Sequence, residues 1–187
     1  MKARLIQVLL CAGLAGLYPD GAHPQSSRYL VKPGDSILSI AEALRPQEAT
    51  VNQMALALLR ANAAALQAGA VRLPVGTSLA VPEPASVLKM DADIAAREFA
   101  TLWRAEQHYR AAQALEGSRD MFFAFTSYVE AAKLGHGLAQ RRLGELYDRD
   151  MSGFVQRDLQ ESMRWYERAR LSQVDVRRQG SRMPKQH

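Results

Sequence analysis

The alternation of polar and apolar residues near the start of the chain predicts a short strand and a helix. Arg28 to Lys32 alternates polar and apolar side chains and ends at a Pro-Gly pair, which is typical of a strand followed by a turn. Apolar residues then recur at spacings of three and four from Ile37 to Leu44, and Pro46 closes this run. We therefore predict a first helix with Asp35 as its N-cap.

A second helix and a second strand follow in the pattern. Thr50 and Gln53 have the spacing of a capping box, in which each side chain satisfies a backbone amide at the start of a helix. The second helix is predicted from about Val51 to Leu66, and Thr77 to Val81 is predicted to form the closing strand. The predicted order is strand, helix, helix, strand.

Residues 84–90 are predicted to be a linker. In the residues that follow, apolar side chains recur with the spacing of amphipathic helices, and we predict four such helices. Asp91 is the predicted N-cap of a long helix that ends at Gly117, the second helix stops at Gly135, and Asp158 begins the fourth in a predicted capping box. The predicted inward stripes consist, in chain order, of Ala95, Phe99, Leu102, Ala105, Tyr109 and Ala112; Phe122, Phe125, Val129 and Ala132; Ala139, Leu143 and Leu146; and Leu159, Met163, Tyr166 and Ala169. No helix of this kind buries its apolar face alone.

The helical part contains an internal repeat. A shift of 37 residues aligns Tyr128-Val129-Glu130 with Trp165-Tyr166-Glu167, and it also aligns Ala132-Lys133-Leu134 with Ala169-Arg170-Leu171. Helix pairs that recur at such a period predict an α/α solenoid. By Val174 the second copy has decayed, so we expect a truncated array.

The stretch YLVKPGDSILSIAEAL, followed by RP, VNQMALALLRAN and LPVGTSLAVP, resembles a LysM domain, and more narrowly the periplasmic LysM module of FimV-type polar scaffold proteins. The resemblance covers residues 28–83 and implies an α+β module of βααβ order. It also implies binding of peptidoglycan or another polymer that contains N-acetylglucosamine. The implied glycan-binding residues lie in two loops, with Gly34, Asp35, Ser36 and Ile37 in the first and Asn62, Ala63 and Leu66 in the second.

The residues themselves leave structural alternatives open at two of these positions. Asp35 is also the predicted helix cap, and Asn62 has a structural role as its alternative to sugar contact. Many sugar-binding LysM domains have Asn-Pro where this chain has Asn62-Ala63, and an aromatic residue where it has Leu38. Tyr29 is the single aromatic residue of the module, so we expect weak affinity for sugar.

The stretch YVEAAKLGHGLAQRRLGELY, followed by GFVQRDLQESMRWYERA, resembles a Sel-one-like repeat, which is a relative of the tetratricopeptide repeat. The resemblance implies an all-α repeat segment over residues 91–173 that binds another protein on its concave face. Six aromatic residues are predicted to form the core of the repeats, with a partner-binding surface as the alternative: Trp103, Phe122, Phe123, Phe125, Trp165 and Tyr166.

The first residues of the chain have the pattern of a secretory leader. MKAR precedes an apolar run from Leu5 to Leu17 and a helix-breaking stretch, which predicts a signal peptide over residues 1–22 and a periplasmic location. The run is short for a membrane span, and we expect no span elsewhere. Cys11, the single cysteine, lies in this leader, so the mature chain is expected to have no disulfide. Acylation at Cys11 is the alternative.

The distribution of charge and the positions of the histidines limit the partners and the metal sites that we expect. The net charge is +5, and the surplus lies late, with a basic tail over residues 174–187 that is either a frayed end or a contact for an anionic partner. The predicted export argues against nucleic acid as this anionic partner. The four histidines, His23, His108, His136 and His187, have no metal-ligand spacing, and His136 between two glycines is expected to pack at a helix turn. We predict no catalytic residue, no metal and no cofactor.

These patterns together predict a periplasmic adaptor that binds peptidoglycan through the LysM-like module and a protein through the helical repeats. The alternative is a subunit or assembly factor of an envelope complex, in which the module no longer binds sugar.

Overall fold

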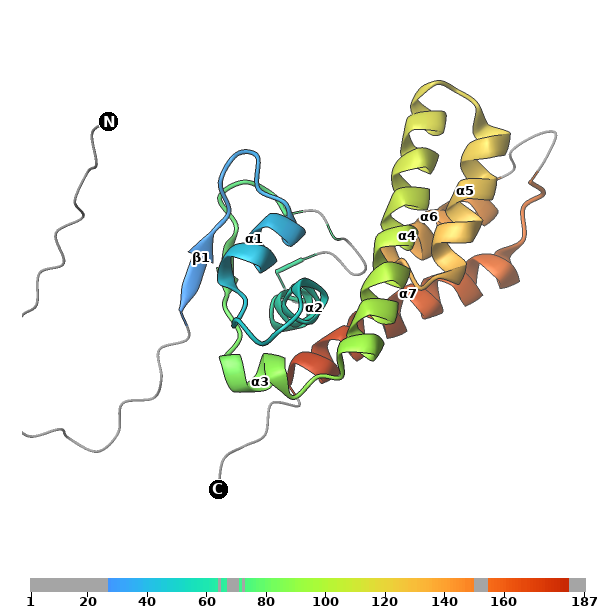
Figure 1. The fold of residues 1–187 in the computed structure, drawn as a ribbon. Helices are drawn as coiled ribbons and strands as arrows, with labels where there is room; N and C mark the ends of the chain where they lie inside the picture. The colour runs from blue at the N-terminus through green and yellow to red at the C-terminus, as the bar shows by residue number, and fades with distance from the viewer. Residues whose placement is uncertain (1–26, 64, 67–70, 72, 150–154, 182–187) are drawn as a thin grey trace, which may run out of the picture.

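A computed structural model describes residues 27–63, 65–66, 71, 73–149 and 155–181, with side chains described up to residue 172. The elements in chain order are β1 (Arg28–Leu30), α1 (Ile37–Leu44), α2 (Val51–Ala61), β2 (Ser78–Ala80), α3 (Pro84–Leu88), α4 (Ala92–Gly117), α5 (Met121–Lys133), α6 (Gly137–Tyr147) and α7 (Leu159–Ser181). Helix α4 lies between the part that contains the two strands and the part that contains α5 and α6 (Figure 1).

Residues 28–80 have the predicted strand, helix, helix, strand order. The two strands pair antiparallel, with Tyr29 opposite Leu79. Leu79 is fully buried, whereas Leu30 is 59% exposed, so one face of this small sheet covers the core and the other faces solvent.

The two helices of this unit both begin with a capping box. At α2 the box consists of Thr50 and Gln53, as predicted, but the helix ends at Ala61 instead of near Leu66. At α1 the N-cap is Ser36, which pairs reciprocally with Ser39. The prediction of Asp35 as N-cap is therefore wrong by one residue, because the Asp35 carboxylate accepts hydrogen bonds from the preceding turn and from the β1 strand.

The first hydrophobic core extends beyond residues 28–83. Residues 84–90, predicted to be a linker, contain α3, and Val87 of this helix is completely buried in the first core. Phe99 from the first half of α4 is buried in the same core, and Leu102 packs against it. The strand-containing unit is thus completed by α3 and by the start of the helical part.

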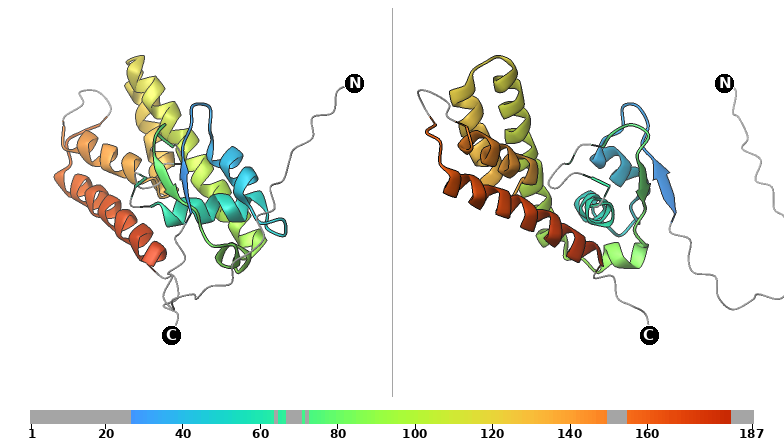
Figure 2. Two further views of the ribbon diagram at one scale, coloured as in Figure 1. Left: turned by 90° about the vertical axis from the view of Figure 1, so that its left-hand side faces the viewer. Right: turned by 180° about the vertical axis from the view of Figure 1, so that it is seen from behind.

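The second hydrophobic core lies among α4, α5, α6 and α7. It is formed by Ala112, Ala124, Tyr128, Ala131, Ala132, Ala139, Leu143, Leu146 and Trp165. Helix α4 therefore contributes to two cores, the first through its amino-terminal half and the second through its carboxyl-terminal half. Side views show α7 lying across the outer side of this helical part (Figure 2).

The predicted inward stripe of α7 is wrong at three of its four positions. Leu159, Met163 and Tyr166 are 52%, 70% and 39% exposed, whereas Ser162, Trp165 and Ala169 face the interior. Close approach of α6 and α7 fixes this rotation: the Ser162 hydroxyl donates to the Gly144 carbonyl oxygen at 2.8 Å, and a Cβ at Gly144 would lie 2.8 Å from the Tyr166 ring.

Two aromatic residues of α5 also differ from the prediction of a repeat core. Phe122 and Phe123 are 58% and 57% exposed, and their rings pack edge to face with centroids 5.3 Å apart. The inward face of α5 is formed instead by Tyr128 and by alanines, which allow α4 and α6 to approach closely. Among the described residues, no helix has the length and apolar character needed to cross a membrane.

Leu143→Ala tests the second core. The Leu143 side chain is completely buried, and its truncation leaves a cavity that should lower the free energy of unfolding by about 2 to 5 kcal/mol. Chemical denaturation monitored by circular dichroism measures the loss. Leu159→Ala, at a 52% exposed position, is the matched control and should change stability far less. Equal losses in the two variants would contradict the assigned core.

Candidate functional site

The loop between β1 and α1 is the more exposed of the two loops implied in glycan binding. Gly34 has a φ of +87°, a left-handed conformation that favours glycine, and it lies at the surface together with Ser36. Asp35 locks this turn, because its Oδ2 accepts the Lys32 backbone N–H at 2.8 Å and its own N–H donates to the Lys32 carbonyl oxygen at 3.1 Å. The loop is therefore held in one conformation before any ligand binds.

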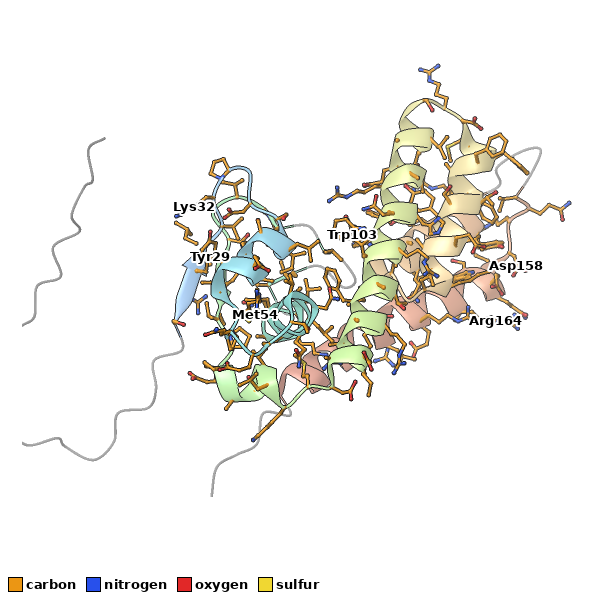
Figure 3. All side chains as sticks on the ribbon, in the orientation of Figure 1. Tyr29, Lys32, Met54, Trp103, Asp158 and Arg164 are labelled. Carbon is orange, nitrogen blue, oxygen red and sulfur yellow. The ribbon has the colours of Figure 1, made fainter. Side chains whose placement is uncertain are left out.

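Tyr29 adds an aromatic ring beside this loop. Its hydroxyl donates to Asp35 Oδ2 at 2.9 Å, and the Lys32 ammonium lies 6.0 Å from its ring centroid (Figure 3). The hydrogen bonds from the Lys32 backbone and from Tyr29 lower the pKa of Asp35, and the hydrogen bond to Asp35 raises the pKa of Tyr29. Asp35 is thus ionised and engaged by the protein at neutral pH.

In the second loop, Asn62 is a structural residue. Its Nδ2 donates to the carbonyl oxygens of Leu58 and Ala80 at 2.8 and 2.9 Å, and its Oδ1 accepts the Ala80 backbone N–H at 2.7 Å. The side chain is only 5% exposed. Asn62 therefore pairs with β2 much as a neighbouring strand would, and it fastens the end of α2 to the sheet.

The seven implied glycan-binding residues divide by burial. Ile37 and Leu66 belong to the first hydrophobic core, which places both loops over that core, and Asn62 is buried beside β2. The remaining four lie wholly or partly at the surface: Gly34, Asp35, Ser36 and Ala63. The structure therefore offers a smaller surface for sugar than the resemblance implies.

A buried polar cluster centred on Glu106 joins the two parts of the chain. Glu106 is 3% exposed, and its carboxylate lies 3.2 Å from Nε2 of His136 and 2.8 Å from Nε of Arg110. The backbone N–H of Val71, which belongs to the connection between α2 and β2, donates to the same carboxylate at 3.4 Å. Glu106 lies seven residues after Phe99 and therefore on the same buried face of α4. This spacing is the feature of the sequence that indicates burial of Glu106.

His136 caps α6 inside this cluster. Its Nδ1 accepts the backbone N–H of Ala139 at 3.3 Å, so the proton of the neutral ring resides on Nε2 and is donated to Glu106. The Tyr109 ring stacks on the imidazole with centroids 4.3 Å apart, and His136 has no exposed surface. These contacts agree with the expected packing of His136 at a helix turn.

The electrostatics of Glu106 follow from these contacts. Burial acts to raise the pKa of its carboxyl, but the hydrogen bonds from His136 and Arg110 outweigh burial, and the pKa lies below its ordinary value of 4.5. The cluster therefore holds a buried carboxylate that is ionised at neutral pH.

Glu116 organises a second polar cluster nearer the surface. It accepts the Tyr128 hydroxyl at 2.6 Å and pairs with Arg142, which also donates to Glu145 at 2.6 Å. The cluster joins α4, α5 and α6. Within the residues that the structure describes, no group of three or more His, Cys, Asp and Glu side chains is placed to hold a metal ion.

No family model, curated protein sequence or solved structure matches the chain. The function is therefore inferred from the chain's own residues and their contacts.

Asn62→Ala tests the structural role of this amide. The substitution leaves the Ala80 N–H and carbonyl without their partner, and each buried unsatisfied group costs about 1 to 3 kcal/mol. Urea denaturation should show a loss of at least this size. Asn52→Ala, at a partly exposed position of the same helix, should have a small effect. A loss at Asn62 no larger than at Asn52 would refute the structural assignment.

The pH dependence of stability tests the Glu106 cluster. Because its native pKa is lowered below 4.5, the ionised carboxylate stabilises the fold fully above that pH, and the contribution is lost as the pH falls through the lower native pKa. Thermal unfolding from pH 7 to pH 3 should show a smaller acid-induced loss for Glu106→Gln than for the unmodified protein. Glu48→Gln, at an exposed position, should retain the unmodified slope.

Proposed function

We propose that the chain is a non-catalytic adaptor of the periplasm, which binds peptidoglycan through residues 28–83 and an envelope protein through its helical part, in pilus, secretion or polar assembly. The observation that carries the proposal is the exposed loop between β1 and α1. Asp35 and the capping box of Ser36 and Ser39 fix its backbone from both sides. A preformed loop loses little conformational entropy on binding a polymer.

The polymer would lie over Gly34 and Ser36 in the first loop and over Ala63 in the second, beside the half-buried ring of Tyr29. The bond from Tyr29 to Asp35 fixes the orientation of this ring. Asn62 supports the surface through β2 and makes no sugar contact in this proposal, because its hydrogen-bonding groups face the backbone of Leu58 and Ala80.

The helical part supports the protein-binding half of the proposal. Phe122 and Phe123 expose more than half of their surface on α5, as do Leu159 and Met163 on α7. Large exposed apolar side chains of this kind are candidates for a protein interaction surface. The helices themselves are fixed by the second core and by the Glu116 cluster.

One observation favours the alternative, a subunit or assembly factor of an envelope complex in which the module binds no sugar. Of the seven implied glycan-binding residues, Ile37, Asn62 and Leu66 are buried. The exposed remainder contains no aromatic residue and few side-chain hydrogen-bonding groups, and Tyr29 beside it supplies a single ring. Binding is therefore expected to be weak, with a dissociation constant in the high micromolar range, equivalent to about −5 to −6 kcal/mol.

Sedimentation with purified, insoluble peptidoglycan at moderate salt distinguishes the two functions. The whole protein should be used, because Val87, Phe99 and Leu102 complete the core under the loops and a fragment of residues 28–83 lacks them. The protein should enter the pellet, aided by the many binding sites that the insoluble polymer offers.

Two tryptophan variants locate the binding surface. Ala63→Trp places a large side chain over the second loop and should leave most of the protein in the supernatant. Val75→Trp adds the same side chain at a 63% exposed position outside the two implied loops and should sediment like the unmodified protein. An unmodified protein that stays in the supernatant would remove peptidoglycan binding and leave the alternative in its place.

A further inference from the structure

We propose that Trp103 of α4 belongs to the glycan-binding surface and supplies an aromatic platform on which an N-acetylglucosamine ring of the polymer stacks. The inference rests on the proposed function and adds one residue to the same site. Trp103 lies outside residues 28–83, but it is on the side of α4 that faces the strand-containing part (Figure 3).

The position of Trp103 follows from its neighbours on α4. Phe99 lies one turn before it and is buried in the first hydrophobic core together with Leu66 of the second implied loop. Glu106 lies about one turn after it and accepts the backbone N–H of Val71, in the connection between α2 and β2. Residues at spacings of four and three share one side of a helix, so Trp103 lies on the side of α4 along which this connection runs.

The end of α2 is fixed to the same helix. Arg60 in the last turn of α2 forms an ion pair with Glu98 of α4. The second implied loop begins directly after this turn, with Asn62 and Ala63. The ion pair and the shared core therefore hold this loop against α4, and Trp103 has a fixed position relative to it.

The indole ring of Trp103 is held in place by the protein. It stacks on the ring of Phe99, with centroids 6.3 Å apart and 27° between the ring planes, and 39% of the residue is exposed. Phe99 is only 6% exposed, so the support under the indole is part of the first core. A ring that is supported in this way loses little rotamer freedom when a ligand stacks on its other side.

The chemistry of a sugar ring matches this platform. The face of an aromatic ring carries negative charge density, which attracts the weakly positive C–H groups on one face of a pyranose. Together with the half-buried ring of Tyr29, Trp103 would give a long polymer two stacking positions. Gln107 is exposed one turn further along α4, and its amide can donate to and accept from sugar hydroxyl and acetamido groups.

Sedimentation of the whole protein with insoluble peptidoglycan tests the platform. Trp103→Ala should lower the apparent affinity by about five- to tenfold, because it removes the entire ring. Trp103→Phe keeps a smaller ring and should have an intermediate affinity. Phe122→Ala, which removes a 58% exposed ring on α5, is the matched control and should sediment like the unmodified protein.

Tryptophan fluorescence tests the same contact while the platform is intact. The chain has two tryptophans, and Trp165 is buried in the second core. In Trp165→Phe the emission comes from Trp103 alone. Addition of a soluble oligomer of N-acetylglucosamine should change the intensity and wavelength of this emission in a saturable manner.

Thermal unfolding of each variant separates binding from folding, and the fluorescence of Trp165→Phe decides the matter if Trp103→Ala does not fold. A folded Trp103→Ala that sediments like the unmodified protein, or a Trp103 emission that the oligomer leaves unchanged, overturns the platform. Peptidoglycan binding by the unmodified protein would then stand without it. An unmodified protein that stays in the supernatant overturns both the platform and the proposed function.

Discussion

The buried carboxylate of Glu106 is the interaction on which the arrangement of the chain depends. It receives hydrogen bonds from the connection that follows α2, from α4 itself and from the cap of α6, so a single side chain joins the first core to the second. A buried charge is tolerated only when its partners compensate for lost hydration, and here each carboxylate oxygen has such partners. Because α4 contributes Phe99 to one core and Ala112 to the other, the two halves share a helix as well as this carboxylate.

In the strand-containing part, too, polar side chains form their hydrogen bonds within the protein, so few of them remain for a ligand. The side-chain amide of Asn62 is hydrogen bonded to the backbone of α2 and β2. The Asp35 carboxylate accepts a hydrogen bond from the turn beside it. What remains for a ligand is the rigid, exposed backbone of the loop at Gly34 and a small surface around Ala63. A protein with such a site would depend on many weak contacts with a repetitive polymer more than on one tight pocket.

In the helical part, several large apolar side chains are exposed. Phe122 and Phe123 on α5 and Leu159 and Met163 on α7 are exposed and lie outside the second core, which is the basis for the proposed protein-binding surface. The Tyr166 ring of α7 packs closely on Gly144 of α6, a contact that a residue larger than glycine at position 144 would prevent.

The sequence alone determined the local features of this protein. Capping residues such as Thr50 and Gln53, the glycine at position 34 and the long period of α4 act within a few residues of the chain, so their pattern predicted the strand order and most helix limits. The tertiary structure decided the rest. Which side of α7 faces inward depended on Gly144, far along the chain, and the role of Asn62 depended on Ala80. Burial of Glu106 depended on His136, because long-range partners, which no local pattern specifies, supply the compensation that a buried charge requires.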